Sequence, residues 1–375
     1  MGDRNSRIDV LRGVAVLLVM QLHMNWWALF GETLRLPPFL IIFLDYGWAG
    51  VDIFFVISAY LLTAGLLRHA GGAHLATRFY ARRALRILPL YWALLLAGSI
   101  GRAWWLSGGG AESFWLWRNQ QPMTNYLLFL QNWVVGWDPA PQAEFYGPTW
   151  SLAVEEHFYL ALPLLVFWLG PRKLGHLATC LVLATPAIRM ALVVWPGPAA
   201  SYNWTIAHLD AFAWGMLVAL AQKFRPDLLT RVSARTWALM ATVAFLGASL
   251  RAHVMGRETD WLLGVSIVSM GGACALLAAI RPAEGSRRKP GVISQALGWC
   301  GTRCFALYLF HMPVLGLTFA AAGWLNPNEA GSATAPLVAL SISLTFTLSA
   351  FAYRFVEQPF MRLANRITPY APAPG

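Results

Sequence analysis

The sequence predicts an all-α, polytopic integral membrane protein of about ten transmembrane helices, with both termini in the cytoplasm. The 375 residues are 58% hydrophobic and only 12% charged, and their mean hydropathy is +0.52. A soluble domain, by contrast, is about half apolar. Long apolar runs recur along the whole chain, each close to the ~20 residues that a helix needs to cross a bilayer core. Basic residues collect in alternate connections between these runs, as expected of a membrane protein.

Ten apolar runs divide the chain into consecutive membrane passes. They are residues 8–28, 47–67, 87–106, 150–170, 176–195, 204–222, 237–254, 262–280, 298–319 and 336–356. With the N-terminus placed in the cytoplasm, 21 of the 28 Lys and Arg residues fall in inward stretches. The outward loops and outer helix ends hold only Arg35, Arg102, Arg118, Arg251 and Arg257. This positive-inside distribution places the C-terminus in the cytoplasm as well.

We expect one integral domain over residues 1–367 and a disordered tail over 368–375. The first run carries Arg12 and no small-residue cleavage site, so we expect it to be retained as a helix rather than removed as a signal peptide. The longest outward loop, 107–149, contains an apolar stretch at 126–135 that is too short to cross the membrane. This stretch is predicted to be re-entrant or interfacial.

The net charge of +11 does not indicate nucleic-acid binding. The positive residues act as topology signals and as contacts to anionic lipid heads, so the lipid bilayer is the expected partner. The four cysteines are Cys180, Cys274, Cys300 and Cys304, and no paired His or Cys at metal-ligand spacing accompanies them. We therefore predict no metal site and interpret Cys300 and Cys304 as small buried residues.

Ionisable residues inside the apolar runs are costly in lipid and usually mark function. The first run places Arg12 at the cytoplasmic face and His23 in the outer half, ~16 Å apart on a helix. Asp52 begins the second run near its outer end, and we expect it to lie level with His23. Two interpretations of Asp52 stay open, because it could cap its own helix or orient a histidine. His23 could likewise be a packing residue.

The third run is preceded by Arg83 and Arg86. They are three residues apart, so both side chains lie on one helical face. Two guanidinium groups on one face suit the binding of phosphate groups. The alternative is a topology signal that contacts lipid headgroups.

The fourth run opens with Trp150 and Ser151 and continues through Glu155, Glu156 and His157. Thr149 or Ser151 can cap the helix. Two carboxylates and an imidazole then enter the bilayer within the first turns. Three adjacent ionisable side chains predict a polar functional cavity at this point.

Later runs add three more ionisable groups. Arg189 and Asp210 are expected in the outer half of the membrane, and His311 nearer its middle. His311 could serve function or simply hydrogen-bond for packing, and the roles of His157 and His208 are open.

These segments, in this order, resemble the acyltransferase 3 family of membrane O-acyltransferases, over nearly the whole chain. The matching pieces are Arg7-Ile-Asp9-Val-Leu-Arg12-Gly13 with His23, Gly50-Val-Asp52-Ile-Phe-Phe-Val-Ile-Ser58, Arg83-x2-Arg86 with Pro89, Trp150-Ser151-Leu-x2-Glu155-Glu156-His157-Phe158-Tyr159, Tyr308-x2-His311 and Glu357-x-Pro359. One departure is Ser58-Ala59, where the family usually has Ser-Gly. Many members modify bacterial surface polysaccharides, lipopolysaccharide, peptidoglycan or secondary metabolites.

The resemblance implies a co-substrate, acyl-CoA, with acetyl-CoA the expected form. Arg12, Arg83 and Arg86 would hold its phosphates at the cytoplasmic face by charge-assisted hydrogen bonds. His23 would act as general base on a hydroxyl of a carbohydrate or glycolipid acceptor. A variant in which His23 carries the acyl group covalently stays open.

Three carboxylates, Asp52, Glu155 and Glu156, are candidates to orient the His23 ring and stabilise its charged form. Substrate contacts and oxyanion donors are expected among Ser58, Tyr60, Trp150, Ser151, His157, Asp210 and His311.

Two other classes of protein stay open. One is a transporter or flippase that moves a lipid-linked sugar or a small solute, and the other is a receptor or scaffold without catalysis. We expect a multi-pass protein of the bacterial inner membrane. The sequence leaves open the acceptor, the acyl chain length, the oligomeric state and the role of loop 107–149.

Overall fold

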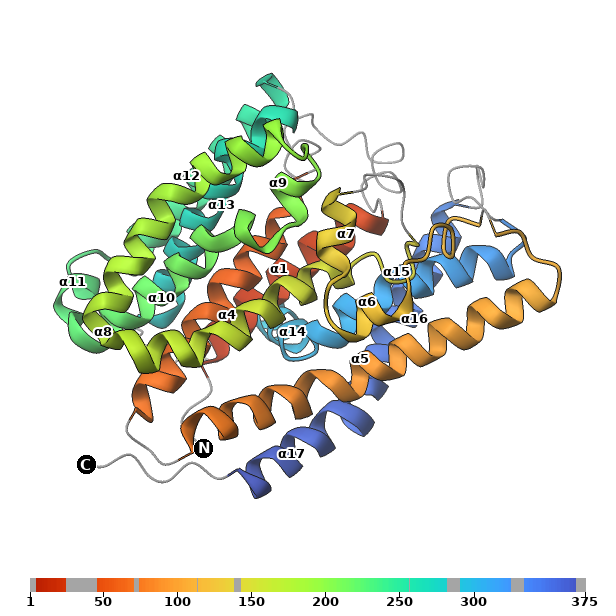
Figure 1. The fold of residues 1–375 in the computed structure, drawn as a ribbon, viewed down its shortest axis with the longest axis horizontal. Helices are drawn as coiled ribbons and strands as arrows, with labels where there is room; N and C mark the ends of the chain where they lie inside the picture. The colour runs from red at the N-terminus through yellow and green to blue at the C-terminus, as the bar shows by residue number, and fades with distance from the viewer. Residues whose placement is uncertain are drawn as a thin grey trace.

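The computed structural model describes residues 5–24, 46–70, 74–112, 114–137, 143–255, 257–281, 291–324 and 334–368, and every regular element within them is helical (Figure 1). Eight of these helical segments are long and apolar enough to cross a membrane. Helix α1 (Ser6–Met24) corresponds to the first predicted span but is not among these eight. Helix α8 (Thr149–Val194) holds two predicted spans joined by a kink. The all-α, multi-pass fold class is thereby confirmed.

Helix α4 (Ala49–Arg68) packs antiparallel against α1 in very close contact. The approach depends on Gly50, because a Cβ atom there would collide with the carbonyl oxygen of Ala15. On another side of α1, Gly13 allows a similar approach to α14 (Val292–Thr302). Small residues at such contacts are typical of membrane helices, which gain no hydrophobic drive from association in lipid.

Helix α5 (Leu75–Ser107) lies at one side of the molecule, with α17 (Gln358–Ile367) beside its N-terminal half (Figure 1). Arg82 on α5 donates hydrogen bonds to the Thr368 carbonyl oxygen, at 2.6 Å from Nη2 and 3.1 Å from Nε. The end of α17 is therefore tied to α5. The rest of the predicted disordered tail, 369–375, lies outside the described residues.

Loop 107–149 contains two short helices, α6 (Met123–Leu127) and α7 (Gln131–Trp137). Neither is long enough to cross the membrane, as predicted for residues 126–135. The Gln131 side chain donates a 2.9 Å hydrogen bond to the Thr149 carbonyl oxygen. This bond fixes α7 against the start of α8.

Helix α8 turns back at Gly170, which Figure 1 shows as a sharp bend. Its φ of 65° is left-handed, a conformation that glycine adopts without steric cost. The two arms correspond to the predicted spans 150–170 and 176–195. The chain then passes through α9 (Ala200–Asn203) and the 3-10 turn η1 (Thr205–His208).

Seven further helical elements complete the part of the fold that the structure describes. They are α10 (Leu209–Phe224), α11 (Pro226–Thr230), α12 (Ala234–Met255), α13 (Arg257–Ile280), α15 (Cys304–Ala321), α16 (Thr334–Ala352) and the π-helical turn η4 (Tyr353–Glu357). Helix α10 packs on α4 and α8, α12 pairs with α13, and α15 pairs with α16.

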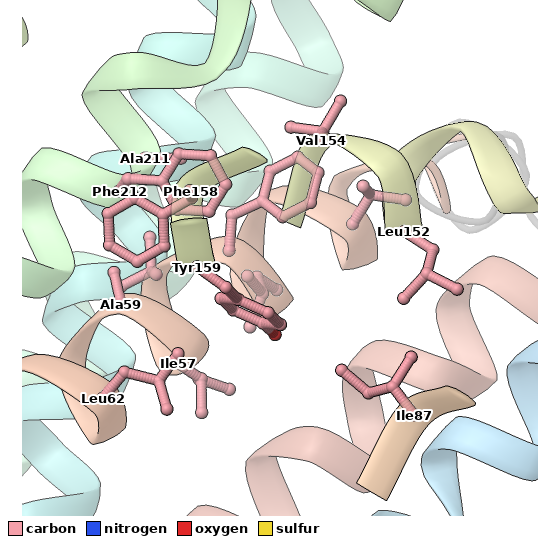
Figure 2. Packing of buried hydrophobic residues seen from close by; sticks show 14 of the residues in the cluster. Ile57, Ala59, Leu62, Ile87, Leu152, Val154, Phe158, Tyr159, Ala211 and Phe212 are labelled. Carbon is pink, nitrogen blue, oxygen red and sulfur yellow. The ribbon is translucent and has the colours of Figure 1, made fainter. Parts of the chain in front are cut away.

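Aromatic packing between α8 and α10 forms part of the core (Figure 2). The ring of Phe158 stacks on that of Phe212, with centroids 4.2 Å apart and planes 5° from parallel. The next side chain on α8, Tyr159, leaves this layer and points into a space bordered by Ile57 and Ile87 (Figure 2). That space is the candidate site.

Candidate functional site

A cavity of about 180 Å³ lies between α1, α4, α5, α8 and α15. Its wall along α4 extends from Val51 to Leu62, which is ~16 Å of helix. Apolar side chains such as Ile87 and Leu152 cover much of its surface (Figure 2). The polar lining residues are Arg12, Ser58, Arg83, Arg86, Ser151, Glu155, Tyr159, Cys304 and Tyr308. A polar cavity at this position was predicted from the fourth span.

Three guanidinium groups reach this cavity. Arg83 and Arg86 come from one face of α5, as their spacing predicts, and Arg12 comes from α1. Neither Arg83 nor Arg86 has a hydrogen bond or ion pair to any residue that the structure describes. Glu155 is the one carboxylate among the lining residues. Excess positive charge with free N–H donors suits the binding of an anion such as a phosphate group.

Two hydroxyl groups hold the Glu155 carboxylate. Ser58 on α4 donates from Oγ to Oε1 at 2.8 Å, and Tyr159 donates from its hydroxyl to Oε2 at 2.6 Å. Tyr159 is one helical turn beyond Glu155, so both side chains lie on the cavity face of α8. The carboxylate is therefore fixed at the cavity wall and joins α8 to α4.

A second polar link joins α8 to α15. The hydroxyl groups of Ser151 and Tyr308 are 2.6 Å apart, and Tyr308 also donates to the Pro148 carbonyl oxygen at 3.0 Å. Cys304, one turn before Tyr308, lines the same cavity and is buried, as predicted for the cysteines of this helix. The start of α15 is thus part of the site.

His23 lies beyond this cavity and is not among its lining residues. Its ring faces that of His311, with centroids 5.1 Å apart and planes at 55°. The His311 ring in turn lies 5.7 Å from that of Tyr308, which does line the cavity. A row of three rings therefore leads from the cavity to His23.

The structure corrects the expected level and partner of Asp52. Its Oδ1 atom lies 2.9 Å from Nδ1 of His208, and both side chains are fully buried. The close contact of Gly50 with Ala15 sets the register between α4 and α1. Along this antiparallel pair, Asp52 therefore lies on one side of that contact, whereas His23 lies ~12 Å beyond Ala15 on the other side.

The other two carboxylates are also placed away from His23. Glu155 is engaged by Ser58 and Tyr159, and Oε1 of Glu156 is buried without a hydrogen-bond partner in the described ranges. Among the described residues, the Val19 carbonyl oxygen is the acceptor of the hydrogen bond that the His23 ring donates from Nδ1, at 2.9 Å. The expected carboxylate–His23 contact is therefore absent from the described part of the chain.

Asp210 belongs to a separate buried ion pair. Arg189 donates to both its carboxylate oxygens, at 3.1 and 2.7 Å, and Ser266 donates to Oδ2 at 2.6 Å. The pair joins the second arm of α8 to α10 and α13. Asp210 thus contributes to the fold at this place and does not line the cavity.

The other substrate and oxyanion candidates divide into two groups. Ser58 and Ser151 line the cavity. Tyr60 instead donates to Oε1 of Gln222 at 2.8 Å, and the Trp150 ring packs 5.7 Å from that of His208. His157 likewise lies away from the cavity, with its Nδ1 2.7 Å from the Thr205 hydroxyl group.

The sequence interpretation missed two tyrosines of the cavity. Tyr159 is four residues after Glu155, and Tyr308 is three residues before His311. Helical spacing places each on the same face as its neighbour, so this rule could have found both. His208 is different, because its partner Asp52 is 156 positions away and no local signal connects them.

The fold and the cavity define a membrane-embedded helical protein with guanidinium, carboxylate and hydroxyl groups gathered at one buried site. The family model described as the acyltransferase domain matches residues 5–354. The chain therefore belongs to the acyltransferase 3 family, as its motifs indicated, and is an acyltransferase domain.

Several curated proteins are similar to this chain over most of its length. The peptidoglycan O-acetyltransferase OatA of Listeria monocytogenes is 26% identical over 377 residues, which cover 95% of this chain and 55% of that protein. A putative peptidoglycan O-acetyltransferase of Bacillus subtilis is 26% identical, with 94% and 54% covered. A putative O-acetyltransferase of Staphylococcus aureus is 25% identical, with 95% and 57% covered. The chain thus spans about half the length of the curated relatives it matches. No solved structure matches it.

Proposed function

We propose that this protein transfers an acetyl group from cytosolic acetyl-CoA to a hydroxyl group of a carbohydrate acceptor. The names of the relatives support O-acetylation of a peptidoglycan-type glycan. One structural observation carries the proposal for the donor. Arg83 and Arg86 line a buried cavity and make no hydrogen bond or ion pair among the described residues, beside a carboxylate held by two hydroxyl groups.

The donor's phosphates would bind at the guanidinium end of the cavity. Arg83 and Arg86 would supply charge-assisted N–H donors, and Arg12 would add a third positive charge. The arm of the coenzyme would then follow the wall of α4 past Ser58 and Glu155. The ~16 Å length of that wall is of the order needed to carry a thioester from the cytoplasmic side towards the middle of the membrane.

His23 would act as the general base at the acceptor end. Its Nδ1 lies 2.9 Å from the Val19 carbonyl oxygen, which can only accept, so Nδ1 carries the proton of the neutral ring and Nε2 keeps its lone pair. Nε2 would take the acceptor's hydroxyl proton as the oxygen attacks the thioester carbon. The thiolate is a good leaving group and requires little acid assistance.

A thiol-release assay tests the proposal directly. Purified protein in detergent would be given labelled acetyl-CoA with and without a soluble glycan acceptor, and free thiol would be measured. We expect acceptor-dependent release from the wild-type protein and its loss in His23→Ala protein that inserts and folds normally. Equal release by the two proteins would refute the role of His23. Solute uptake by proteoliposomes without thiol release would instead indicate a transporter.

The proposed donor and acceptor together indicate where in the cell the protein acts. The domain is an integral multi-pass membrane protein, and we infer that it lies in a bacterial plasma membrane. There, acetyl-CoA would reach the arginine side from the cytosol, and a cell-envelope glycan would be acetylated at the outer side.

A further inference from the structure

The paired rings of His23 and His311 share one protonation pattern. His311 Nδ1 lies 2.7 Å from the Tyr308 carbonyl oxygen, just as His23 Nδ1 lies 2.9 Å from that of Val19. A carbonyl oxygen accepts hydrogen bonds only, so each neutral ring must carry its proton on Nδ1. Each ring therefore presents an unprotonated Nε2 atom, which is its basic atom.

The basic Nε2 atom of His311 takes part in no hydrogen bond with the described residues. The side chain that carries it is fully buried. An unpaired polar atom in a buried site is unfavourable and is uncommon without a reason. Two neutral rings that both offer a lone pair have no proton to share, which accounts for the missing bond.

A proton on His23 changes this relationship. Once Nε2 of His23 is protonated it becomes a donor, and the nearby ring of His311 offers an acceptor. The ring centres are 5.1 Å apart, close enough for two nitrogen atoms that point at one another to come within hydrogen-bond distance. No carboxylate of the described residues hydrogen-bonds to either ring, so His311 is the group placed to stabilise the charge on His23.

We propose that His311 is the proton-relay partner of His23 in the acyl transfer; this rests on the proposed function above. The acceptor's O–H bond breaks and its proton goes to Nε2 of His23, while the oxygen bonds to the acyl carbon. The C–S bond breaks and its electron pair stays on sulfur. The proton then passes to Nε2 of His311 and finally to the thiolate, which leaves as the free thiol.

The position of Tyr308 supports the direction of this relay. Tyr308 lies one turn before His311 on α15, their rings are 5.7 Å apart, and Tyr308 lines the cavity assigned to the donor. His311 therefore neighbours both the proposed base and a tyrosine of the donor cavity. His311 acts through His23 and through the leaving group, and it makes no contact with the acceptor in this scheme.

The test compares His311→Asn with His23→Asn, the double variant and His176→Asn in the thiol-release assay. Asparagine keeps an N–H group for the Tyr308 carbonyl oxygen but has no basic nitrogen.

We expect His311→Asn to lower kcat by about 100-fold, the scale of general base catalysis, with the KM for acetyl-CoA unchanged. The double variant should be no slower than His23→Asn, because residues that act as one unit are not additive. His176 is exposed and does not line the cavity, so His176→Asn should match the wild-type protein.

Three results would overturn the relay while the wild-type protein remains active. They are a wild-type kcat for His311→Asn, a rise in KM that accounts for its whole loss of activity, and a double variant slowed by the product of the single effects. Nitrogen NMR of isotope-labelled histidine in the wild-type protein tests the same proposal without any variant. Both rings should show the Nδ1–H tautomer, and an Nε2–H tautomer in either would contradict it. A wild-type protein without acceptor-dependent thiol release would instead overturn the proposed function itself.

Discussion

Glu155 and Ser58 meet at the wall of the cavity, where the serine hydroxyl donates a 2.8 Å hydrogen bond to the carboxylate. Tyr159 donates to the second oxygen at 2.6 Å, so both carboxylate oxygens are held. The negative charge lies in the same cavity as three arginines, of which Arg83 and Arg86 make no ion pair among the described residues. Glu155 therefore organises the centre of the cavity and forms no ion pair with Arg83 or Arg86, which we propose bind phosphate.

Glu155→Gln tests this separation of roles. Hydrogen bonds to a charged group are each worth about 1.5–3 kcal/mol, so their weakening should lower kcat by about 10- to 100-fold. The KM for acetyl-CoA should not rise, because loss of a negative charge cannot weaken the attraction for phosphate. Steady-state thiol release would give both constants, with Glu112→Gln in the exposed loop as the matched control. A raised KM with an unchanged kcat would show that Glu155 serves donor binding.

Arg86→Ala should have the opposite signature. Removal of a charge-assisted contact worth about 1.5–3 kcal/mol should raise the KM for acetyl-CoA by about 10- to 100-fold. Arg78→Ala is the control, since Arg78 lies on the same helix but does not line the cavity. An unchanged KM in Arg86→Ala would refute the phosphate role.

The membrane passes and the shared face of Arg83 and Arg86 could be predicted from the sequence, because both depend on periodicity within one helix. The partner of Asp52 could not. Its level relative to His23 depends on how α4 slides along α1, and Gly50 decides that register through contact with the Ala15 backbone. His208 ends the 3-10 turn that precedes α10, and from there it reaches Asp52. Contacts between helices, rather than properties of each helix, determine which polar groups meet.

Loss of one partner of the Arg189–Asp210 ion pair should destabilise the protein strongly, whereas replacement of both partners by apolar residues should not. Both side chains are at most 1% exposed. Arg189→Met should destabilise the protein by about 3–5 kcal/mol, because it leaves a buried carboxylate without its counter-ion. Arg189→Met with Asp210→Leu should recover most of this loss. Thermal unfolding in detergent would measure both, and a double variant less stable than Arg189→Met would contradict the argument.

Loop residue Glu144 should make stability depend on pH. Burial raises the pKa of this carboxyl above its ordinary value of 4.5, and the charge of Arg118 only partly opposes the shift. A carboxyl with a raised folded-state pKa binds its proton more tightly when folded, so stability falls as the pH rises from 4.5 through the raised pKa.

Glu144→Gln should therefore increase the unfolding temperature at neutral pH and have little effect in acid. Unfolding temperatures measured for both proteins across this pH range would check the expectation. A variant less stable than the wild-type protein at neutral pH would show that the attraction to Arg118 outweighs the cost of burial.

The register between α1 and α4 gives a prediction that joins fold to activity. A Cβ atom at Gly50 would collide with the Ala15 carbonyl oxygen, whereas one at Gly65 on the same helix would meet no atom within 4 Å. Gly50→Ala should therefore cost about 1–3 kcal/mol, as overpacking does. Gly65→Ala should be neutral or stabilise by up to about 1 kcal/mol, because alanine favours helix. Since α1 carries both Arg12 and His23, Gly50→Ala should also lower acceptor-dependent thiol release. Equal stability and activity of the two variants would mean that this contact does not set the register of the site.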